Sequence, residues 1–207
     1  MNFDPANIVA LIIAASFAAG LNLYATVLTL GLLARAQWVE LPPGLDSLGH
    51  TWVLIACGVL FCAEFVADKI PGVDLIWNAI HTFVRIPVAA LVAYHASSQL
   101  SPQMQILATG IGAVVALAAH SSKSAIRAAV TPSPEPVSNI ALSTTEDVAA
   151  VGLTWAATHH PVMAASVALV LLAGAILAAR HLFRMLRRLL GRLNPLAKSP
   201  ALPTARS

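Results

Sequence analysis

Charged side chains occur in this sequence where a membrane helix would carry apolar ones. The segment AEFVADKIPGVD, residues 63–74, follows a hydrophobic run and contains three carboxylates and Lys69. Glu64 and Asp68 are four residues apart, so they share one helix face and repel each other. They require compensation by a cationic side chain, a shared proton or a bound cation. The Pro-Gly dipeptide that follows ends the helix, and Asp74 is placed to cap the next one.

Cationic side chains that could compensate these acids occur in two later segments. Only about ten apolar residues follow Arg85 before a polar turn, too few to cross a hydrocarbon core of about 30 Å. The helix must therefore begin earlier, and Arg85 must lie within the membrane or in a wet cavity. His120, Lys123 and Arg127 recur at i, i+3 and i+7, which places them on one helix face. They either meet the acids or form a helix end whose long side chains reach to the membrane surface.

Two further segments carry polar residues inside apolar stretches. Glu146 and Asp147 form a second acidic pair, and Ser143 to Glu146 has the pattern of a capping box. This pattern predicts a helix that begins part-way through the membrane at these residues. Asn22 and Tyr24 follow Gly20 in the middle of a long apolar stretch and predict a break in the first helix.

The elements that must position these residues are membrane helices. The chain of 207 residues is 58% hydrophobic and only 10% charged, whereas soluble domains carry roughly 25% charged residues. About 20 apolar residues are needed for one span. We therefore expect an all-α polytopic bundle with about six spans, some of them broken or re-entrant: 6–34, 51–67, 74–95, 103–119 with an extension to 130, 140–158 and 161–179.

The distribution of basic residues predicts an orientation. After Asp147 the chain has seven basic residues and no acid, and such segments remain in the cytoplasm. Six spans would place the N-terminus there too. Residues 1–180 form the expected membrane domain, and residues 181–207 form a basic amphipathic cytoplasmic tail suited to anionic lipids. The net charge of +3 comes from this tail, so nucleic acid is not an expected partner.

The order of the polar segments suggests a weak internal repeat of three spans plus three. Helices one and four each carry a polar interruption, and helices two and five each carry an acidic pair. Three spans in each half would make the halves inverted, as in many transporters whose broken helices place the site near the membrane midplane. The halves show negligible sequence identity.

The polar motifs together resemble a known family. They are Gly20-Leu21-Asn22-x-Tyr24, Glu64-x-x-x-Asp68-Lys69 with Asp74 and Arg85, His120-x-x-Lys123-x-x-x-Arg127, and Ser143-x-x-Glu146-Asp147. This combination, which covers about residues 8 to 175, resembles the bacterial membrane family known as domain of unknown function 4126. The resemblance implies a small polytopic protein of the bacterial inner (cytoplasmic) membrane and no established activity.

Charges of both signs inside the membrane are a functional-site hypothesis by default. The first hypothesis is a transporter, channel or flippase for a small ion or an anionic solute or lipid. Six short spans are few for a secondary transporter, so either a homodimer would be needed for a full path or the protein would be a flippase or a small channel. The substrate- or ion-binding candidates are Asn22, Tyr24, Glu64, Asp68, Lys69, Asp74, Arg85, His120, Lys123, Arg127, Glu146 and Asp147.

Two alternatives remain open. Buried ion pairs can serve only to fix the packing of helices, which would make this a structural or assembly protein. Carboxylates and imidazoles could instead bind a divalent cation in an intramembrane enzyme. No catalytic residue is nominated and no other cofactor is expected, because the sequence has none of the usual hydrolase or metalloprotease motifs. An enzyme is therefore the less favoured alternative.

Overall fold

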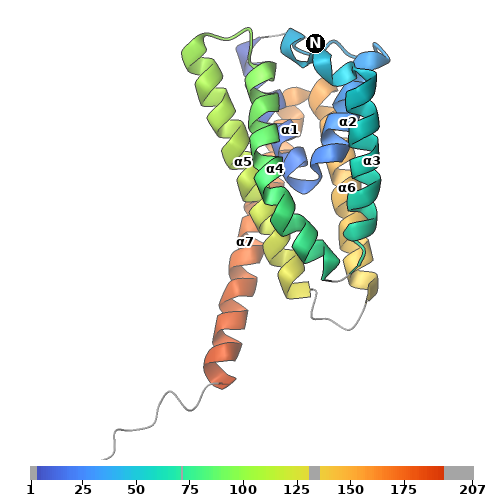
Figure 1. Ribbon diagram of the computed structural model, residues 1–207. Coiled ribbons are helices and arrows are strands. Elements are labelled where there is room, and N and C mark those ends of the chain that lie inside the picture. Colours follow the sequence, from blue (N-terminus) through green and yellow to red (C-terminus); the bar gives the residue numbers. More distant parts are fainter. Residues whose placement is uncertain (1–3, 71, 131–135, 194–207) are drawn as a thin grey trace, which may run out of the picture.

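The computed structural model describes residues 4–70, 72–130 and 136–193, and these ranges are helical without any strand. The all-α prediction is confirmed. Helices α3 to α7 run between the two ends of one bundle (Figure 1). We call the end where α3 begins the upper end, and the end where α3 finishes the lower end. The elements are α1 Pro5–Leu21, α2 Leu23–Arg35, the 3-10 helix η1 Pro43–Gly49, α3 Thr51–Ala67, α4 Val73–Ala96, α5 Pro102–Val130, α6 Pro136–His159 and α7 Pro161–Leu193.

The first apolar stretch is two short helices that form a hairpin. Asn22 separates them with extended backbone angles, φ −146° and ψ 106°. Its side chain accepts a hydrogen bond from the amide of Ala25 at 2.9 Å and so caps α2. At about 1.5 Å per residue, the 17 residues of α1 and the 13 of α2 are each shorter than a membrane span.

Packing contacts show that this hairpin turns back within the bundle. Ile8, near the start of α1, and Leu30, near the end of α2, belong to one apolar cluster with Ala96 at the upper end of α4. Gly20 lies instead against Ala116 and Ala119, near the middle of α5. The hairpin therefore descends from the upper end, turns at residues 20–23, and returns (Figure 1). We call residues 20–23 the hairpin tip.

This turn differs from the expected single span over 6–34. By length and composition, three helices in the described ranges could cross a membrane, α4, α5 and α7, or four if η1 and α3 count as one bent span. Six spans are not confirmed. The first turn of α1 and the last turn of α7 lie at opposite ends of the bundle (Figure 1). The expectation that both termini lie on one side of the membrane is therefore not confirmed, because it depended on an unbroken first span.

The expected inverted repeat is not confirmed either. Its two halves required equivalent interruptions in the first and fourth helices. In the structure the first is divided at Asn22, whereas α5 is continuous from Pro102 to Val130. The first and fourth helices of the expected repeat therefore both carry polar residues, but only the first has an interrupted backbone.

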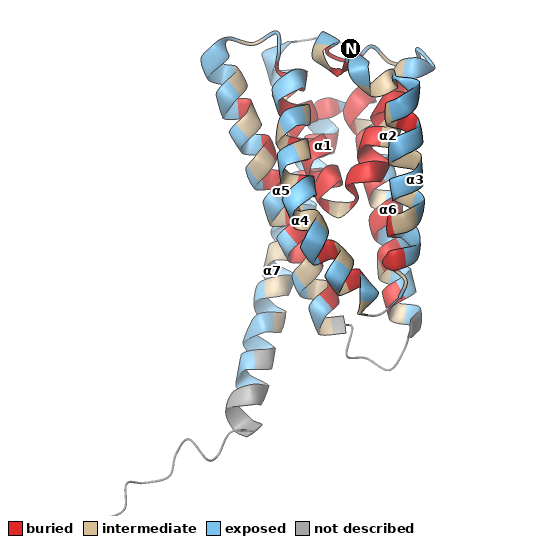
Figure 2. Ribbon diagram, viewed as in Figure 1, coloured by how far each residue is buried: buried red, intermediate tan, exposed pale blue. Residues whose placement is uncertain are grey.

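Small residues bring the hairpin close to its neighbours. Most of α1 is buried, whereas the surrounding helices expose their outer faces (Figure 2). The exposed residues are large and apolar, as lipid-facing surfaces are; they include Ile55, Val59, Ile80 and Phe83. Close approach through small residues is the usual basis of helix packing in membranes, because lipid supplies no hydrophobic driving force between helices.

Gly112→Ala should therefore destabilise the bundle. A Cβ at this position of α5 would lie 2.5 Å from Cβ of Ala93 and 2.9 Å from Oγ of Ser16, so α1 and α4 would have to move. Overpacking of this kind costs about 1–3 kcal/mol. Gly110→Ala on the same helix is the matched control, since its Cβ would meet nothing within 4 Å. Unfolding temperatures in detergent should fall for the first variant only; equal temperatures would contradict the close packing.

Candidate functional site

Nine charged side chains gather beneath the hairpin tip, in the lower half of the bundle. We call them the ion network. Five are carboxylates and four are cationic, and they come from α3, α4, α5, α6 and the turn after α3. Burial of so many charges is costly unless they are paired and hydrogen-bonded. The members are Glu64, Asp68, Lys69, Asp74, Arg85, Lys123, Arg127, Glu146 and Asp147.

Arg85 connects α4 to α3 and to the hairpin tip. Its guanidinium is 1% exposed and donates to Oε1 of Glu64 at 2.5 Å. It also donates to the carbonyl oxygens of Gly20 and Leu21, at 3.1 and 3.2 Å. These carbonyls are at the C-terminal end of α1, where the helix dipole is negative and favours a cation. Arg85 therefore satisfies backbone groups that the end of α1 leaves without helical partners.

His120 is neutral in this arrangement. A nitrogen of Arg85 lies 3.1 Å from Nδ1 of His120, and a guanidinium can only donate, so Nδ1 must accept. The ring proton is then on Nε2, which lies 2.7 Å from the hydroxyl oxygen of Thr82. Thr82 in turn donates to the carbonyl of Asn78. His120 is thus a neutral connection between α4 and α5 and adds no charge to the ion network.

Lys123 and Arg127 place the cations of α5 between the acids of α3 and α6. Nζ of Lys123 lies 3.0 Å from Asp68, 3.3 Å from Glu146 and 3.7 Å from Glu64. It also donates to the carbonyl of Leu21 in the hairpin tip at 2.7 Å. The Arg127 guanidinium is fully buried and pairs with Glu146, with Asp68 at 3.1 Å and with Asp74 at 3.5 Å.

Asp74 does not occupy the expected N-cap position. Gly72 precedes α4 there, with a φ of 86° that glycine tolerates, and Asp74 lies in the first turn. Its Oδ1 accepts from the amides of Gly72 and Leu75 at 2.9 and 2.7 Å. Its other oxygen faces Arg127. The carboxylate therefore still compensates free amides at the start of α4 while it joins the ion network.

Asp147 links α6 to the hairpin tip. Nδ2 of Asn22 donates to Oδ1 of Asp147 at 2.9 Å, while Oδ1 of Asn22 caps α2. Lys69 lies 3.9 Å from Oδ2 of Asp147 and 3.5 Å from the hydroxyl of Ser143. Burial lowers the pKa of the Lys69 ammonium, and attraction to Asp147 and Asp68 opposes this effect.

The capping-box prediction at Ser143 is wrong. Helix α6 begins at Pro136, a residue well suited to the first position of a helix. Ser143 is fully buried, and Glu146 and Asp147 lie well inside the helix rather than in its first turn. Glu146 and Asp147 therefore lie on the buried face of a continuous helix and not at a helix start. Residues 131–135, which precede α6, lie outside the described residues.

Two buried amide side chains that bind Asp68 are not among the residues predicted from the sequence. Asn78 donates to Oδ1 of Asp68 at 3.4 Å, and Asn139 donates to its backbone carbonyl at 3.0 Å. The sequence could have indicated Asn78, because Asp74, Asn78 and Arg85 lie on the same, buried face of α4. Trp77 and His81, on the same helix, stack their rings on each other with centroids 4.1 Å apart.

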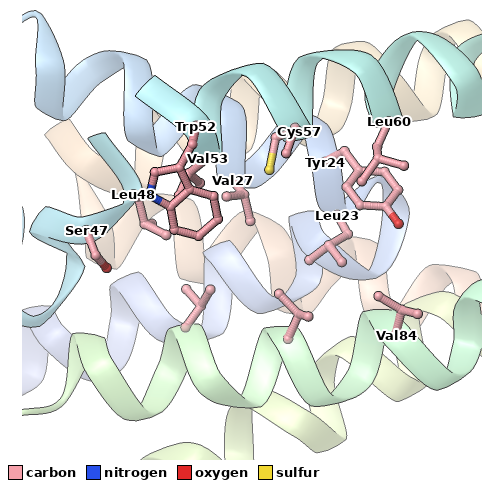
Figure 3. Close-up of a pocket in the computed structure, with 13 residues that line it drawn as sticks. Leu23, Tyr24, Val27, Ser47, Leu48, Trp52, Val53, Cys57, Leu60 and Val84 are labelled. Atoms are coloured by element: carbon pink, nitrogen blue, oxygen red, sulfur yellow. The ribbon is translucent and has the colours of Figure 1, made fainter. Parts of the chain in front are cut away.

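Tyr24 lies beside the ion network, in an apolar cleft of about 430 Å³. Figure 3 shows its hydroxyl at one end of this cleft and Ser47 at the other. The cleft lies between α2, α3 and α4, and its walls include Val27, Cys57 and Val88. The ring of Tyr24 meets His81 edge to face at 5.8 Å. Of the twelve candidates, Tyr24 alone lines this cleft, and the charged ones contact each other elsewhere.

The acids bind cationic side chains rather than forming a metal-ligand set. In the part of the chain that the structure describes, no three His, Cys, Asp or Glu side chains are grouped as they would be around a metal ion. Cys57 and Cys62 are free. A divalent cation remains a prediction without a ligand set among the described residues.

The fold and the site define a class: an all-helical membrane protein with a buried ion network at the tip of an internal hairpin. Residues 9–181 match the family described as "Domain of unknown function (DUF4126)". The chain belongs to this family, as its motifs predict. No curated protein and no solved structure matches the chain.

Proposed function

We propose that the protein transports a small ion, or an anionic solute or lipid, across the membrane, and that the ion network is its site. The observation that carries this proposal is the hairpin tip. Cations of α4 and α5 bind carbonyls at the C-terminal end of α1, and an acid of α6 binds the residue that caps α2. Interrupted helices whose ends face a charged site inside the membrane are characteristic of transporters.

The network supports transport because its charges can be re-paired. Lys123 lies within 4 Å of three different carboxylates, and Arg127 of three. An entering ion could therefore replace one partner while the others remain. Apolar side chains in place of the charged ones would hold the same helices together, often with equal or greater stability of the folded protein. They could not exchange partners in this way.

The orientation that we propose follows from the basic end of α7. Arg180, Arg184, Arg187 and Arg188 favour a cytoplasmic location for the lower end of the bundle. The start of α1 is then outside. We propose that α3 and α6 also cross the bacterial inner membrane beside α4, α5 and α7, although α6 is not identified as a span by its length and composition and α3 is identified only together with η1. Contact of the basic tail with anionic lipids and assembly as a homodimer remain part of this proposal.

A thermal-shift screen of the detergent-purified chain tests the site. Divalent cations, small anions and pH are varied for the wild type and for Glu64→Gln and Glu146→Gln. We expect at least one ion to raise the unfolding temperature of the wild type by several degrees. The same ion should leave the unfolding temperature of both variants unchanged, because each variant removes a partner from the network. Matched shifts in all three proteins would place binding elsewhere and contradict the site.

A structural role is the second candidate, and one observation favours it. Each of the four cations of the network lies within 4 Å of a carboxylate, so the charges can stabilise a fixed arrangement without any ligand. This candidate predicts that no ion shifts the unfolding temperature of the wild type and that both variants are merely less stable. That result would replace transport by a structural or assembly role.

A further inference from the structure

Asp147 is the carboxylate that the ion network binds least tightly. Its Oδ1 accepts from Asn22, but its Oδ2 has no hydrogen-bond partner among the described residues, although its side chain is only 8% exposed. The nearest cation, Lys69, is 3.9 Å away. By comparison, Glu64, Asp68 and Glu146 each accept a hydrogen bond from a cation at 3.1 Å or less.

The formal charges of the network do not balance. It contains five carboxylates and four cationic side chains, and His120 is neutral, so one negative charge is left over. An uncompensated charge in the membrane interior costs several kcal/mol. Asp74 also accepts from two backbone amides at a helix start, whereas Asp147 has no comparable compensation.

The charged groups that face Asp147 come from three elements. Asp68 and Lys69 approach from the end of α3 and the turn after it, Lys123 approaches from α5, and Glu146 precedes it on α6. The hairpin contributes only the neutral Asn22. The part of α7 from Pro161 to Ala179, which packs along α6, contains no charged residue.

The surroundings of Asp147 suit a proton better than a metal ion. A hard metal cation requires several oxygen ligands, but the neighbours of Oδ2 offer an ammonium group. Asp147 also lines a groove between α3 and α6 with Phe61, Phe65 and Thr144. Lys69, whose side chain is 22% exposed, lies between this carboxylate and the lower end of the bundle.

We propose that Asp147 takes up and releases a proton, and that this exchange changes how firmly Asn22 fixes the hairpin tip. The proton comes from water at the lower end and binds Oδ2, so that the carboxylate becomes a neutral carboxyl group and the network loses its excess charge. The hydrogen bond from Asn22 is then no longer charge-assisted and is weaker. This inference rests on the proposed function and names its coupling ion.

Infrared difference spectroscopy of the full chain in lipid nanodiscs tests the proton site. Spectra at about pH 6 and about pH 9, where exposed Asp and Glu are almost entirely ionised, report the C=O stretch of a protonated carboxyl group. The wild type should lose one such band as the pH rises, and Asp147→Asn should lack it. Asp46→Asn, an exposed carboxylate in η1, is the matched control and should keep it. Persistence of the band in Asp147→Asn, or its absence from the wild type, would overturn the assignment.

Two further measurements keep the test independent of one variant. Lys69→Gln leaves Asp147 in place but removes its cation, so the band should disappear at a higher pH than in the wild type. An unchanged midpoint would count against Asp147. Deuterium exchange at residues 22–27, corrected for the intrinsic pH effect, should be roughly fivefold faster at the low pH in the wild type and independent of pH in Asp147→Asn.

The outcomes separate this inference from transport itself. If the band is present and depends on Asp147 but no ion shifts the unfolding temperature in the thermal-shift screen, Asp147 is a proton site in a protein that does not transport. If ions do bind but the band is unchanged in Asp147→Asn, transport is retained and the proton site is refuted.

Discussion

Replacing Arg127 with methionine should destabilise the folded bundle by about 3–5 kcal/mol, the usual cost of removing one partner from a buried ion pair. Methionine preserves much of the side-chain volume, so the effect comes from the charge. Arg127 is fully buried and binds Glu146, Asp68 and Asp74. Without it, Asp74 loses its cationic partner and the other two carboxylates keep only Lys123.

The yield of monodisperse protein and its unfolding in detergent measure this effect. Arg35→Met is the matched control, because Arg35 is exposed and donates one hydrogen bond, to Thr51. It should behave like the wild type, since exposed polar contacts contribute little. Adding Glu146→Gln to Arg127→Met should recover part of the lost stability, because it removes one of the orphaned charges. Equal stability of the two single variants would mean that Arg127 is solvated rather than buried.

The sequence predicts the position of the charged residues more successfully than their partners. A count of apolar residues after Arg85 indicates that this side chain is inside the membrane, and the structure places it at 1% exposure. The expected helix over 51–67 is also found with the same bounds. Both inferences need only the length and hydropathy of a segment and the residues that end a helix, such as proline and glycine. The pairing of Arg85 with Glu64 rather than with Asp68 or Asp74 requires the packing of α3 against α4.

The direction of the chain at Asn22 could not be predicted from local sequence. A polar residue between two apolar helices is compatible with a kinked span and with a hairpin. The contacts that distinguish them involve distant partners: Asp147, which is 125 residues away from Asn22, and Lys123, which is 102 residues from Leu21. The same limitation explains the wrong helix start at Ser143. Its local pattern fits a capping box, but its side chain faces Lys69 in the interior.

The hairpin makes an all-or-none prediction about membrane topology. In a chain whose Cys57 and Cys62 are replaced by serine, single cysteines are introduced by Asp4→Cys, Trp38→Cys and Arg188→Cys at exposed positions. A membrane-impermeant maleimide should label the first two from the same side of the membrane and the third from the opposite side. The reason is that α1 begins and α2 ends at the upper end of the bundle, whereas α7 ends at the lower end (Figure 1).

Labelling of intact cells and of inverted vesicles distinguishes this arrangement from six spans. If residues 6–34 cross the membrane once, the cysteine at position 4 should react from the same side as that at position 188, and the one at position 38 from the other. His160→Cys, between α6 and α7, is the internal control and should follow position 38 in either case. Agreement of positions 4 and 188 would remove the hairpin tip as a structural feature. In that case Asn22 would no longer be expected to connect the end of α1 and the start of α2 to Asp147.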